Sequence, residues 1–279
     1  MNIYGAIIGD VVGSFYEVLE HNAPKQKRPV QERQKILDPK TPLFTKKCCF
    51  TDDSILTTAI AHAIISKESY EKYIRYYGLK ETKNGTQIKC FGRSFVGWLN
   101  GYGGKSFGNG GSMRVSAIGY AFDSLEKTII QAERATICSH SHHEAIDCAK
   151  AVAGSIYLAR TGKSKQEIKK FAEKYLGSLD YDLEYLQNNY TFSSRAILSV
   201  PQAIYCFLVS ENFEDCLRKS ISIGGDSDTI ACIACSIAGA YYEIPPKMIK
   251  NVKRFIPKEY ATILDEFNNQ YALSQENIM

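Results

Sequence analysis

The stretch GAIIGDVVGSFYE, residues 5–17, decides the fold. Its glycines, Gly5, Gly9 and Gly13, recur every four residues, which aligns them on one face of a helix. A face without side chains lets a second helix approach closely, and only a buried helix tolerates so much glycine. The stretch therefore predicts a buried helix that packs tightly against a partner.

Two acids lie on this predicted helix. Asp10 and Glu17 are seven residues apart, or two helical turns, so both carboxylates project from the same side. One interpretation is structural: Asp10 caps a neighbouring helix, and Glu17 lies at the solvent end. The other is that the two acids belong to a functional site. The stretch alone leaves both interpretations open.

The rest of the chain is predicted to be helical as well, because its apolar segments follow the helical period and alternating strand-like runs are hard to find. The clearest predicted helices are residues 54–65, 145–159, 202–209 and 230–242. Polar, Pro-containing or Gly-rich segments, expected to be loops, separate them at residues 24–42, 78–87, 101–111 and 177–189. The first of these is basic and aperiodic, typical of a solvated surface loop, with a mobile cover over a site as the alternative.

Composition excludes several classes of protein. A chain of 279 residues that is 44% hydrophobic, with 18 Tyr and 13 Phe, can build a packed core. A charge of +4, from 34 basic and 30 acidic residues, is too balanced for a nucleic-acid-binding surface. We expect no membrane span and no signal sequence, since Asp10 interrupts the first apolar run. Nine scattered cysteines are typical of reduced thiols, which favours a cytoplasmic location.

Two segments, TDD at 51–53 and DSDT at 226–229, stand directly before apolar helices. Each alone is typical of helix capping, because Thr and Asp are preferred N-caps and acids complement the helix dipole. Together they offer four carboxylates and two hydroxyls, an all-oxygen ligand set suited to Mg²⁺ or Mn²⁺. If the segments converge, two divalent cations would balance the four negative charges.

Two further segments favour ligand binding. The Gly-rich run GGKSFGNGGSMR, residues 103–114, can turn backbone N–H groups onto a phosphate, and Phe107 can stack on a base. The run lacks the spacing of a Walker A or dinucleotide-binding motif. Residues 139–144, SHSHHE, hold three of the five histidines but lack the geometry of a zinc site, so a histidine that donates to a phosphate or fixes the loop is favoured. Cys232 and Cys235 lie inside an apolar helix, which favours core packing over redox chemistry.

In this order the motifs resemble those of the ADP-ribosylglycohydrolase family. The resemblance includes the opening stretch, FTDD at 50–53, FGNGGSMR at 107–114, Ser139-His140 and GGDSDT at 224–229. It runs over nearly the whole chain, and the GSFYE ending of the opening stretch is closest to the branch that acts on ADP-ribosyl-serine. The resemblance implies an all-α fold, a compact single-domain orthogonal helical bundle over residues 1–279. Ligands drawn from both ends of the chain also favour one domain.

The resemblance implies a function and a site. The function is Mg²⁺-dependent hydrolysis of the glycosidic bond at C1″ of ADP-ribose on a protein side chain, Ser or Arg, with release of ADP-ribose. Glu17 would be the catalytic acid or base. Two Mg²⁺ ions, with Mn²⁺ as a possible substitute, would be held by Thr51, Asp52, Asp53, Asp226, Asp228 and Thr229. Phe107 would face the adenine and His140 would lie near the diphosphate, in a substrate-binding set formed by Ser106, Phe107, Gly108, Asn109, Gly110, Gly111, Met113 and His140.

Two segments depart from many bacterial relatives. Residues 139–145 read SHSHHEA in place of THNHPEG, and residues 194–201 read SRAILSVP in place of SCQGSVP. Neither segment holds a predicted metal ligand, so the departures bear on the distal pocket and the acceptor side chain. Two other functions stay open: a non-catalytic ADP-ribose-binding or structural protein on the same fold, and a Mg²⁺-dependent phosphoesterase. The expected partner is an ADP-ribosylated protein or ADP-ribose, with a monomer as the default.

Overall fold

The computed structural model describes residues 2–22, 30–83 and 90–272. These residues form fifteen α-helices, and their only β-type pairings are two isolated bridges, which confirms the all-α prediction. Among them no helix is long and apolar enough to cross a membrane. The helices and short helical turns are α1 (Tyr4–Asn22), α2 (Val30–Gln34), η1 (Lys35–Leu37), α3 (Asp52–Ile65), α4 (Tyr70–Lys83), α5 (Arg93–Leu99), η2 (Asn109–Gly111), α6 (Ser116–Ala121), α7 (Leu125–Ile137), α8 (His143–Arg160), α9 (Lys165–Leu176), α10 (Leu183–Asn189), α11 (Ala196–Leu208), α12 (Phe213–Ser222), α13 (Ser227–Tyr241), α14 (Pro246–Val252), α15 (Lys258–Phe267) and η3 (Asn268–Ala272).

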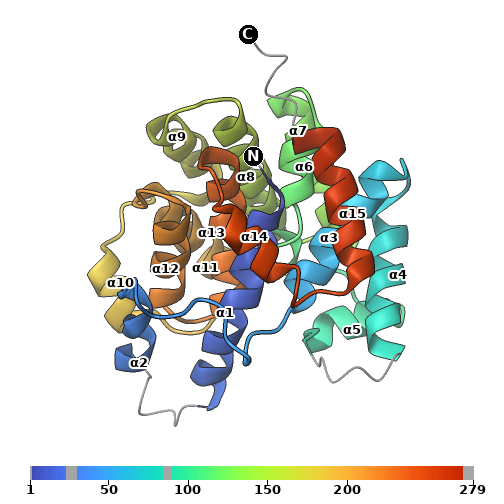
Figure 1. Cartoon of the computed structure of the whole chain (residues 1–279). Helices are drawn as coiled ribbons and strands as arrows, with labels where there is room; N and C mark the ends of the chain where they lie inside the picture. The colour runs from blue at the N-terminus through green and yellow to red at the C-terminus, as the bar shows by residue number, and fades with distance from the viewer. Residues whose placement is uncertain (1, 23–29, 84–89, 273–279) are drawn as a thin grey trace.

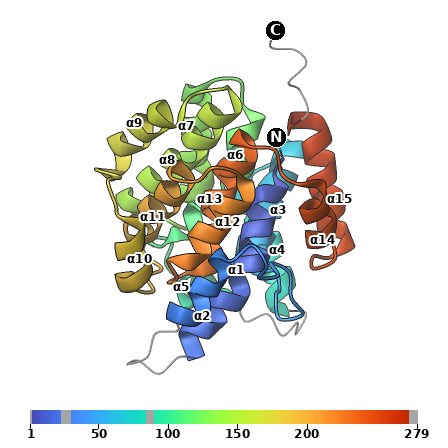
Figure 2. The same cartoon turned by 60° about the vertical axis from the view of Figure 1, so that its left-hand side comes forward.

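Helix α13 is the centre of the fold. Every side chain from Ser227 to Ala240 is buried, because α1, α8, α11 and α12 all pack against this helix. Figures 1 and 2 show α1 and α13 in the middle of the molecule from both directions. A helix that is apolar on all sides is stable only in such an interior position.

The glycine face of α1 lies against the backbone of α13. A Cβ atom added at Gly9 would lie 2.2 Å from the carbonyl oxygen of Ala231. One added at Gly13 would lie 2.5 Å from that of Ser227, and Gly5 approaches α13 just as closely. These separations are far below van der Waals contact, so no larger residue fits. The predicted close approach of a partner helix is confirmed.

The other helices form two groups around this centre. Helices α7, α8 and α9 pack in sequence on one side, and α3 packs with α4 and α15 on the other. The two ends of the described chain meet, since the Ile3 backbone N–H donates to Asn268 Oδ1 at 3.0 Å. The Tyr4 hydroxyl also donates to Asp265 Oδ1 at 3.0 Å.

Three of the expected loops are partly helical. Residues 30–37 form α2 and η1 because the buried Arg33 anchors them, its Nε donating to the Ser222 carbonyl at 2.9 Å. Helix α4 continues through Gly78 to Lys83, and α10 begins after Asp182, whose side chain caps it by accepting from the Tyr185 N–H at 2.6 Å. Residues 38–42 form no helix, and residues 24–29 and 84–87 of the predicted loops lie outside the described residues.

Packing at the glycine face predicts the effect of one methyl group. Gly9→Ala should lower the free energy of unfolding by about 1–3 kcal/mol, since the new Cβ must push the α13 backbone away. Gly97→Ala is the matched control, because its Cβ would meet its nearest atom at an ordinary 3.7 Å within a helix. Urea unfolding should show a loss for Gly9→Ala and no loss for Gly97→Ala. Equal stabilities would contradict the tight contact.

Candidate functional site

The two acidic segments converge on the side of α1. Asp10, Asp53 and Asp228 each place a carboxylate oxygen within 4.8 Å of the others. Glu17, Asp226 and Asp228 form a second group with the same spacing. Asp228 belongs to both groups, so the two are adjacent. Glu17 is half-buried and lies near the more exposed end of α1, where it also belongs to this cluster of acids.

Asp10 has two roles. Its Oδ2 accepts from the backbone N–H groups of Thr51 and Ser54, both at 3.0 Å, so it caps the start of α3 from a different helix. Its Oδ1 accepts from the Thr51 hydroxyl at 2.6 Å. The capping interpretation of Asp10 is confirmed, yet the same carboxylate also belongs to the first acidic group. The sequence signal for this second role was only its spacing from Glu17.

The predicted caps Thr51 and Asp226 do not cap their own helices with their side chains. The Thr51 hydroxyl instead points to carboxylates, Asp10 and, at 3.4 Å, Asp228 Oδ2. The Thr229 hydroxyl donates to Asp53 Oδ2 at 3.2 Å. The side-chain oxygens at the starts of α3 and α13 thus face one another instead of capping their own helices.

The electrostatics of these acids are unfavourable for the charged forms. Burial, followed by the charge of Asp228, raises the pKa of Asp10 to about 7. The same two causes raise the pKa of Asp53 and of Asp226 well above the usual range. Burial and the neighbouring acids raise the pKa of Glu17 to about 10. Like charges in a buried site destabilise one another, and cations are the usual remedy.

One buried oxygen indicates where a cation fits. Asp53 Oδ1 is buried and has no hydrogen-bond partner among the described residues. A buried carboxylate oxygen left without a donor is costly, and a metal ion would satisfy it. Carboxylate and hydroxyl oxygens are ligands that hard divalent cations prefer. The residues present therefore fit the predicted pair of Mg²⁺ or Mn²⁺ ions.

A cavity of about 610 Å³ opens onto the acids. Residues 90–95 form one wall, and residues from the Gly-rich segment form another. The lining residues are Glu17, Val18, Thr51, Asp52, Leu56, Cys90, Phe91, Gly92, Arg93, Ser94, Phe95, Ser106, Gly108, Asn109, Gly110, Met113, His140, Phe192, Ser194, Asp226, Asp228 and Thr229. Of the acids, Asp10 and Asp53 lie behind this surface and are buried.

The Gly-rich segment is held extended between two neighbouring loops. The Asn109 N–H donates to the Ser194 carbonyl at 2.8 Å, and the Ser141 N–H donates to the Gly104 carbonyl at 3.1 Å. The Asn109 side chain then reaches the acids, its Nδ2 donating to Asp226 Oδ2 at 2.7 Å. The phosphate-binding candidate and the metal-binding candidate therefore belong to one site.

Most of the predicted substrate-binding residues line this cavity, with two exceptions. Phe107 is 54% exposed, outside the lining, where its ring centroid lies 5.8 Å from the Arg195 guanidinium. Gly111 is buried and outside the lining, and a Cβ added to it would lie 2.6 Å from Thr136 Cγ2. Phe91 and Phe192 are aromatic residues that do line the cavity. Neither residue lies in a motif, so neither could be predicted from the sequence.

The histidine-rich segment divides by function. His140 is buried in the cavity wall, and burial lowers the pKa of its ring to about 3. His142 caps α8, its Nδ1 accepting from the Glu144 N–H at 3.3 Å. The Glu144 carboxylate accepts from Arg195 at 2.5 and 2.8 Å.

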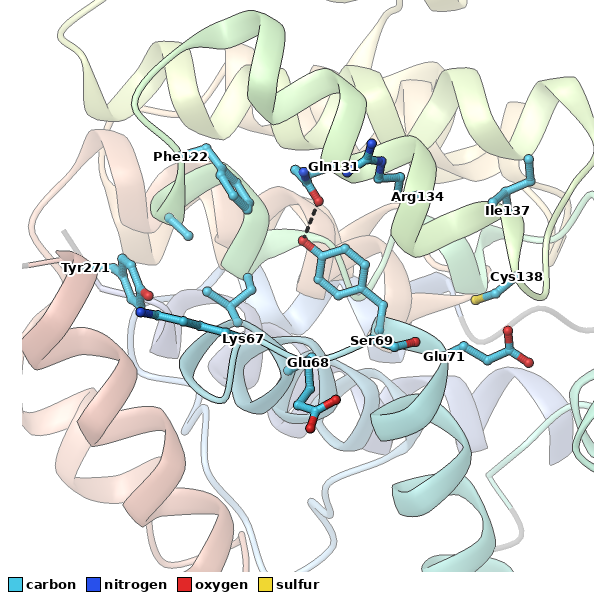
Figure 3. A pocket seen from close by; sticks show the side chains of 14 residues that line it. Lys67, Glu68, Ser69, Glu71, Phe122, Gln131, Arg134, Ile137, Cys138 and Tyr271 are labelled. Atoms are coloured by element: carbon cyan, nitrogen blue, oxygen red, sulfur yellow. Dashed lines mark hydrogen bonds between the residues drawn. The ribbon is translucent and has the colours of Figure 1, made fainter.

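Two other features stand apart from the site. Cys232 and Cys235 are buried in α13, as the core-packing interpretation predicts. A second cavity, of about 630 Å³, lies between the α3–α4 turn and α7 (Figure 3). It contains none of the predicted site residues, and among its lining residues the Tyr70 hydroxyl donates to Gln131 Oε1 at 2.9 Å.

Comparison with known proteins agrees with this geometry. The family model for ADP-ribosylglycohydrolase matches residues 2–277. ADP-ribosylhydrolase ARH3 of Homo sapiens is 28% identical, over 85% of this chain and 83% of that protein. ADP-ribosylarginine hydrolase Tri1 of Pseudomonas putida (strain GB-1) is 24% identical, over 90% of this chain and 72% of that protein.

A solved structure supports the same fold. An ADP-ribosylglycohydrolase-related protein complex superimposes with a TM-score of 0.68 at 21% identity, covering 96% of this chain and 95% of that one. The match of the family model over nearly the whole length settles the relationship: the chain belongs to the ADP-ribosylglycohydrolase family and is an ADP-ribosyl hydrolase.

Proposed function

We propose that the chain is a Mg²⁺-dependent enzyme that hydrolyses the glycosidic bond at C1″ of ADP-ribose attached to a Ser or Arg side chain of a protein. The observation that carries this proposal is the pair of acidic groups sharing Asp228 at the base of a cavity. The names of two relatives, one an ADP-ribosylhydrolase and one an ADP-ribosylarginine hydrolase, agree with it. The product is free ADP-ribose.

The metal ligands proposed from the sequence are Thr51, Asp52, Asp53, Asp226, Asp228 and Thr229. The contacts around Asp10 add a seventh candidate, since its carboxylate lies with Asp53 and Asp228. When bound, the two ions would neutralise the carboxylates and orient the hydroxyls of the distal ribose. Hard oxygen ligands favour Mg²⁺, with Mn²⁺ as a substitute.

Glu17 is the proposed acid or base. It comes from α1 and enters the cavity beside Asp226 and Asp228, on the same floor as the other acids. Cleavage at C1″ develops positive charge on the sugar, and a carboxyl group in this position can protonate the leaving atom or deprotonate the attacking water. In the metal-free protein burial and the neighbouring acids raise the pKa of Glu17, and cations bound to those acids would lower it again.

The chain's own residues also position the substrate. Residues 108–110 form the wall beside His140; the Gly108 and Asn109 N–H groups donate to Ser106 Oγ and to the Ser194 carbonyl, so the His140 ring is the donor that we propose for a diphosphate there. Phe91 and Phe192 offer ring faces to the adenine from within the cavity, which makes them better placed than Phe107. Fixing both ends of the ligand holds C1″ near Glu17, so that positioning supplies much of the rate enhancement.

Metal dependence is the first prediction. Exhaustive treatment with EDTA should abolish release of ADP-ribose, and added Mg²⁺ should restore it. ADP-ribosyl-serine and ADP-ribosyl-arginine peptides, with the polymer as a third substrate, identify the bond that is cut. Chromatography of the products separates the activities: free ADP-ribose supports glycosidic cleavage, whereas AMP with ribose 5-phosphate indicates a phosphoesterase. Full turnover after chelation would contradict metal dependence.

Charge repulsion among the acids predicts an unusual stability effect. Without metal, Asp53→Asn should be at least as heat-stable as the wild type, because it removes one of the repelling charges. The pKa of Asp10 is higher in the folded protein than in the unfolded chain, so the folded protein binds more protons between the two values. The free energy of unfolding of the metal-free wild type should therefore fall as pH rises from about 4 through 7. Thermal unfolding in EDTA at pH 5 and pH 8 measures both effects. A variant that unfolds at room temperature would instead indicate a structural role for Asp53.

Glu17→Gln tests the catalytic assignment. The amide keeps the size of the side chain but cannot exchange a proton, so turnover should fall by roughly 10²-fold to 10⁴-fold. Affinity for ADP-ribose, measured by calorimetry, should change little. Glu126→Gln, on the first turn of α7 and remote from the cavity, is the control and should keep full activity. Activity of Glu17→Gln within a few-fold of wild type would remove the assignment.

A further inference from the structure

The imidazole of His140 presents one nitrogen to the cavity. Its Nε2 lies beside Gly108 and Gly110, since a Cβ added at those glycines would be 3.7 and 2.9 Å from it. Both glycines line the cavity, as His140 does. Within the described part of the chain Nε2 forms no hydrogen bond, so it is available to a ligand at this wall. Whether it donates or accepts depends on where the ring carries its proton.

The contacts of the other ring nitrogen, Nδ1, show which nitrogen carries the proton. His140 Nδ1 lies 2.8 Å from Ser139 Oγ, and Arg114 Nη2 lies 2.8 Å from the same hydroxyl. A guanidinium only donates, so Ser139 Oγ must accept from Arg114. The Ser139 hydroxyl is buried, and Nδ1 is the one acceptor that it reaches among the described residues, so the hydroxyl donates its proton to Nδ1. Burial lowers the pKa of His140 to about 3, so the neutral ring carries a single proton, and that proton is on Nε2.

Arg114 is itself an unusual residue. Its side chain is completely buried, and Nη2 is held by the Ala135 carbonyl at 2.9 Å as well as by Ser139. Its Nε and Nη1 have no hydrogen-bond partner among the described residues. A buried cation without a carboxylate is costly, and an apolar residue of similar size would often serve stability better. A buried positive charge directly behind a cavity wall would attract an anionic ligand to that wall.

We propose that Arg114, acting through the Ser139 hydroxyl, is a positioning residue that fixes His140 as the Nε2–H tautomer, so that the ring donates to an anionic oxygen of the ligand. The identity of that oxygen, in the diphosphate of ADP-ribose, rests on the proposed function. The hydrogen-bond chain from guanidinium to hydroxyl to imidazole is independent of it. Arg114 and Ser139 do not touch the ligand in this arrangement.

The tautomer is measured directly by NMR. Protein labelled with ¹⁵N at histidine, free of ligand, should show His140 as the Nε2–H form, with His140→Gln identifying its signals. Ser139→Ala removes the donor to Nδ1, so the Nδ1–H form should become populated. Ser155→Ala is the matched control, because Ser155 is equally buried and its hydroxyl has no partner. An Nδ1–H tautomer in the wild type, or no change in Ser139→Ala, would overturn the proposal.

Binding measurements test the consequence for the ligand. In Mg²⁺, Ser139→Ala should weaken ADP-ribose by roughly tenfold and leave adenosine, which has no phosphate, unchanged. Arg114→Met should weaken ADP-ribose at least as much without lowering the melting temperature, a separation that a purely structural arginine would not show. If Arg114→Met does not fold, Ser139→Ala decides the matter. Unchanged ADP-ribose affinity in Ser139→Ala would overturn the proposal. A wild-type protein that fails to bind ADP-ribose would contradict the proposed function instead, and the NMR experiment would then decide the tautomer of His140.

Discussion

The backbone contact between α1 and α13 is the constraint on which the rest of the structure depends. Gly9 and Gly13 let the two helices meet without intervening side chains, and a Cβ at Gly13 would lie only 2.6 Å from the Cα of Asp228. This approach places the start of α13 between the two acids of α1, so Asp228 joins both Asp10 and Glu17. The same contact that builds the core therefore also assembles the acidic groups. A larger residue on this face would damage the fold and the site together.

The acidic site works against the stability of the metal-free protein. Carboxylates that are buried and close together have raised pKa values, so each resists ionisation in the folded state. Asp10 offsets part of this cost, because its carboxylate accepts four hydrogen bonds from the backbone N–H and hydroxyl groups of Thr51 and Ser54 at the start of α3. The remaining repulsion couples cation binding to folding, since ions that neutralise the acids also stabilise the fold. Sites that conflict with local stability in this way are typical of function rather than of packing.

Features set by local pattern could be predicted from the sequence, and features set by long-range packing could not. The glycine spacing predicted that a partner helix approaches α1 closely, because glycines four residues apart share one helix face. The TDD and DSDT segments offered a metal site only if they converge, and the family resemblance implied that they do. Arg33 could not be predicted, since the carbonyls that bury it belong to residues far away in the chain. For the same reason Phe192 was missed while the exposed Phe107 was selected from a motif. The hydrogen-bond chain from Arg114 through Ser139 to His140 likewise depends on a tertiary contact.

The central claim is that the two acidic groups hold divalent cations. Anomalous diffraction from crystals soaked with Mn²⁺ tests it most directly, because the ion is located without reference to activity. The account predicts two anomalous peaks, one beside Asp10, Asp53 and Asp228 and one beside Glu17, Asp226 and Asp228, with Asp228 adjacent to both. Crystals that bind no Mn²⁺ in this cavity, or that bind it only at His142 and His143, would contradict this claim.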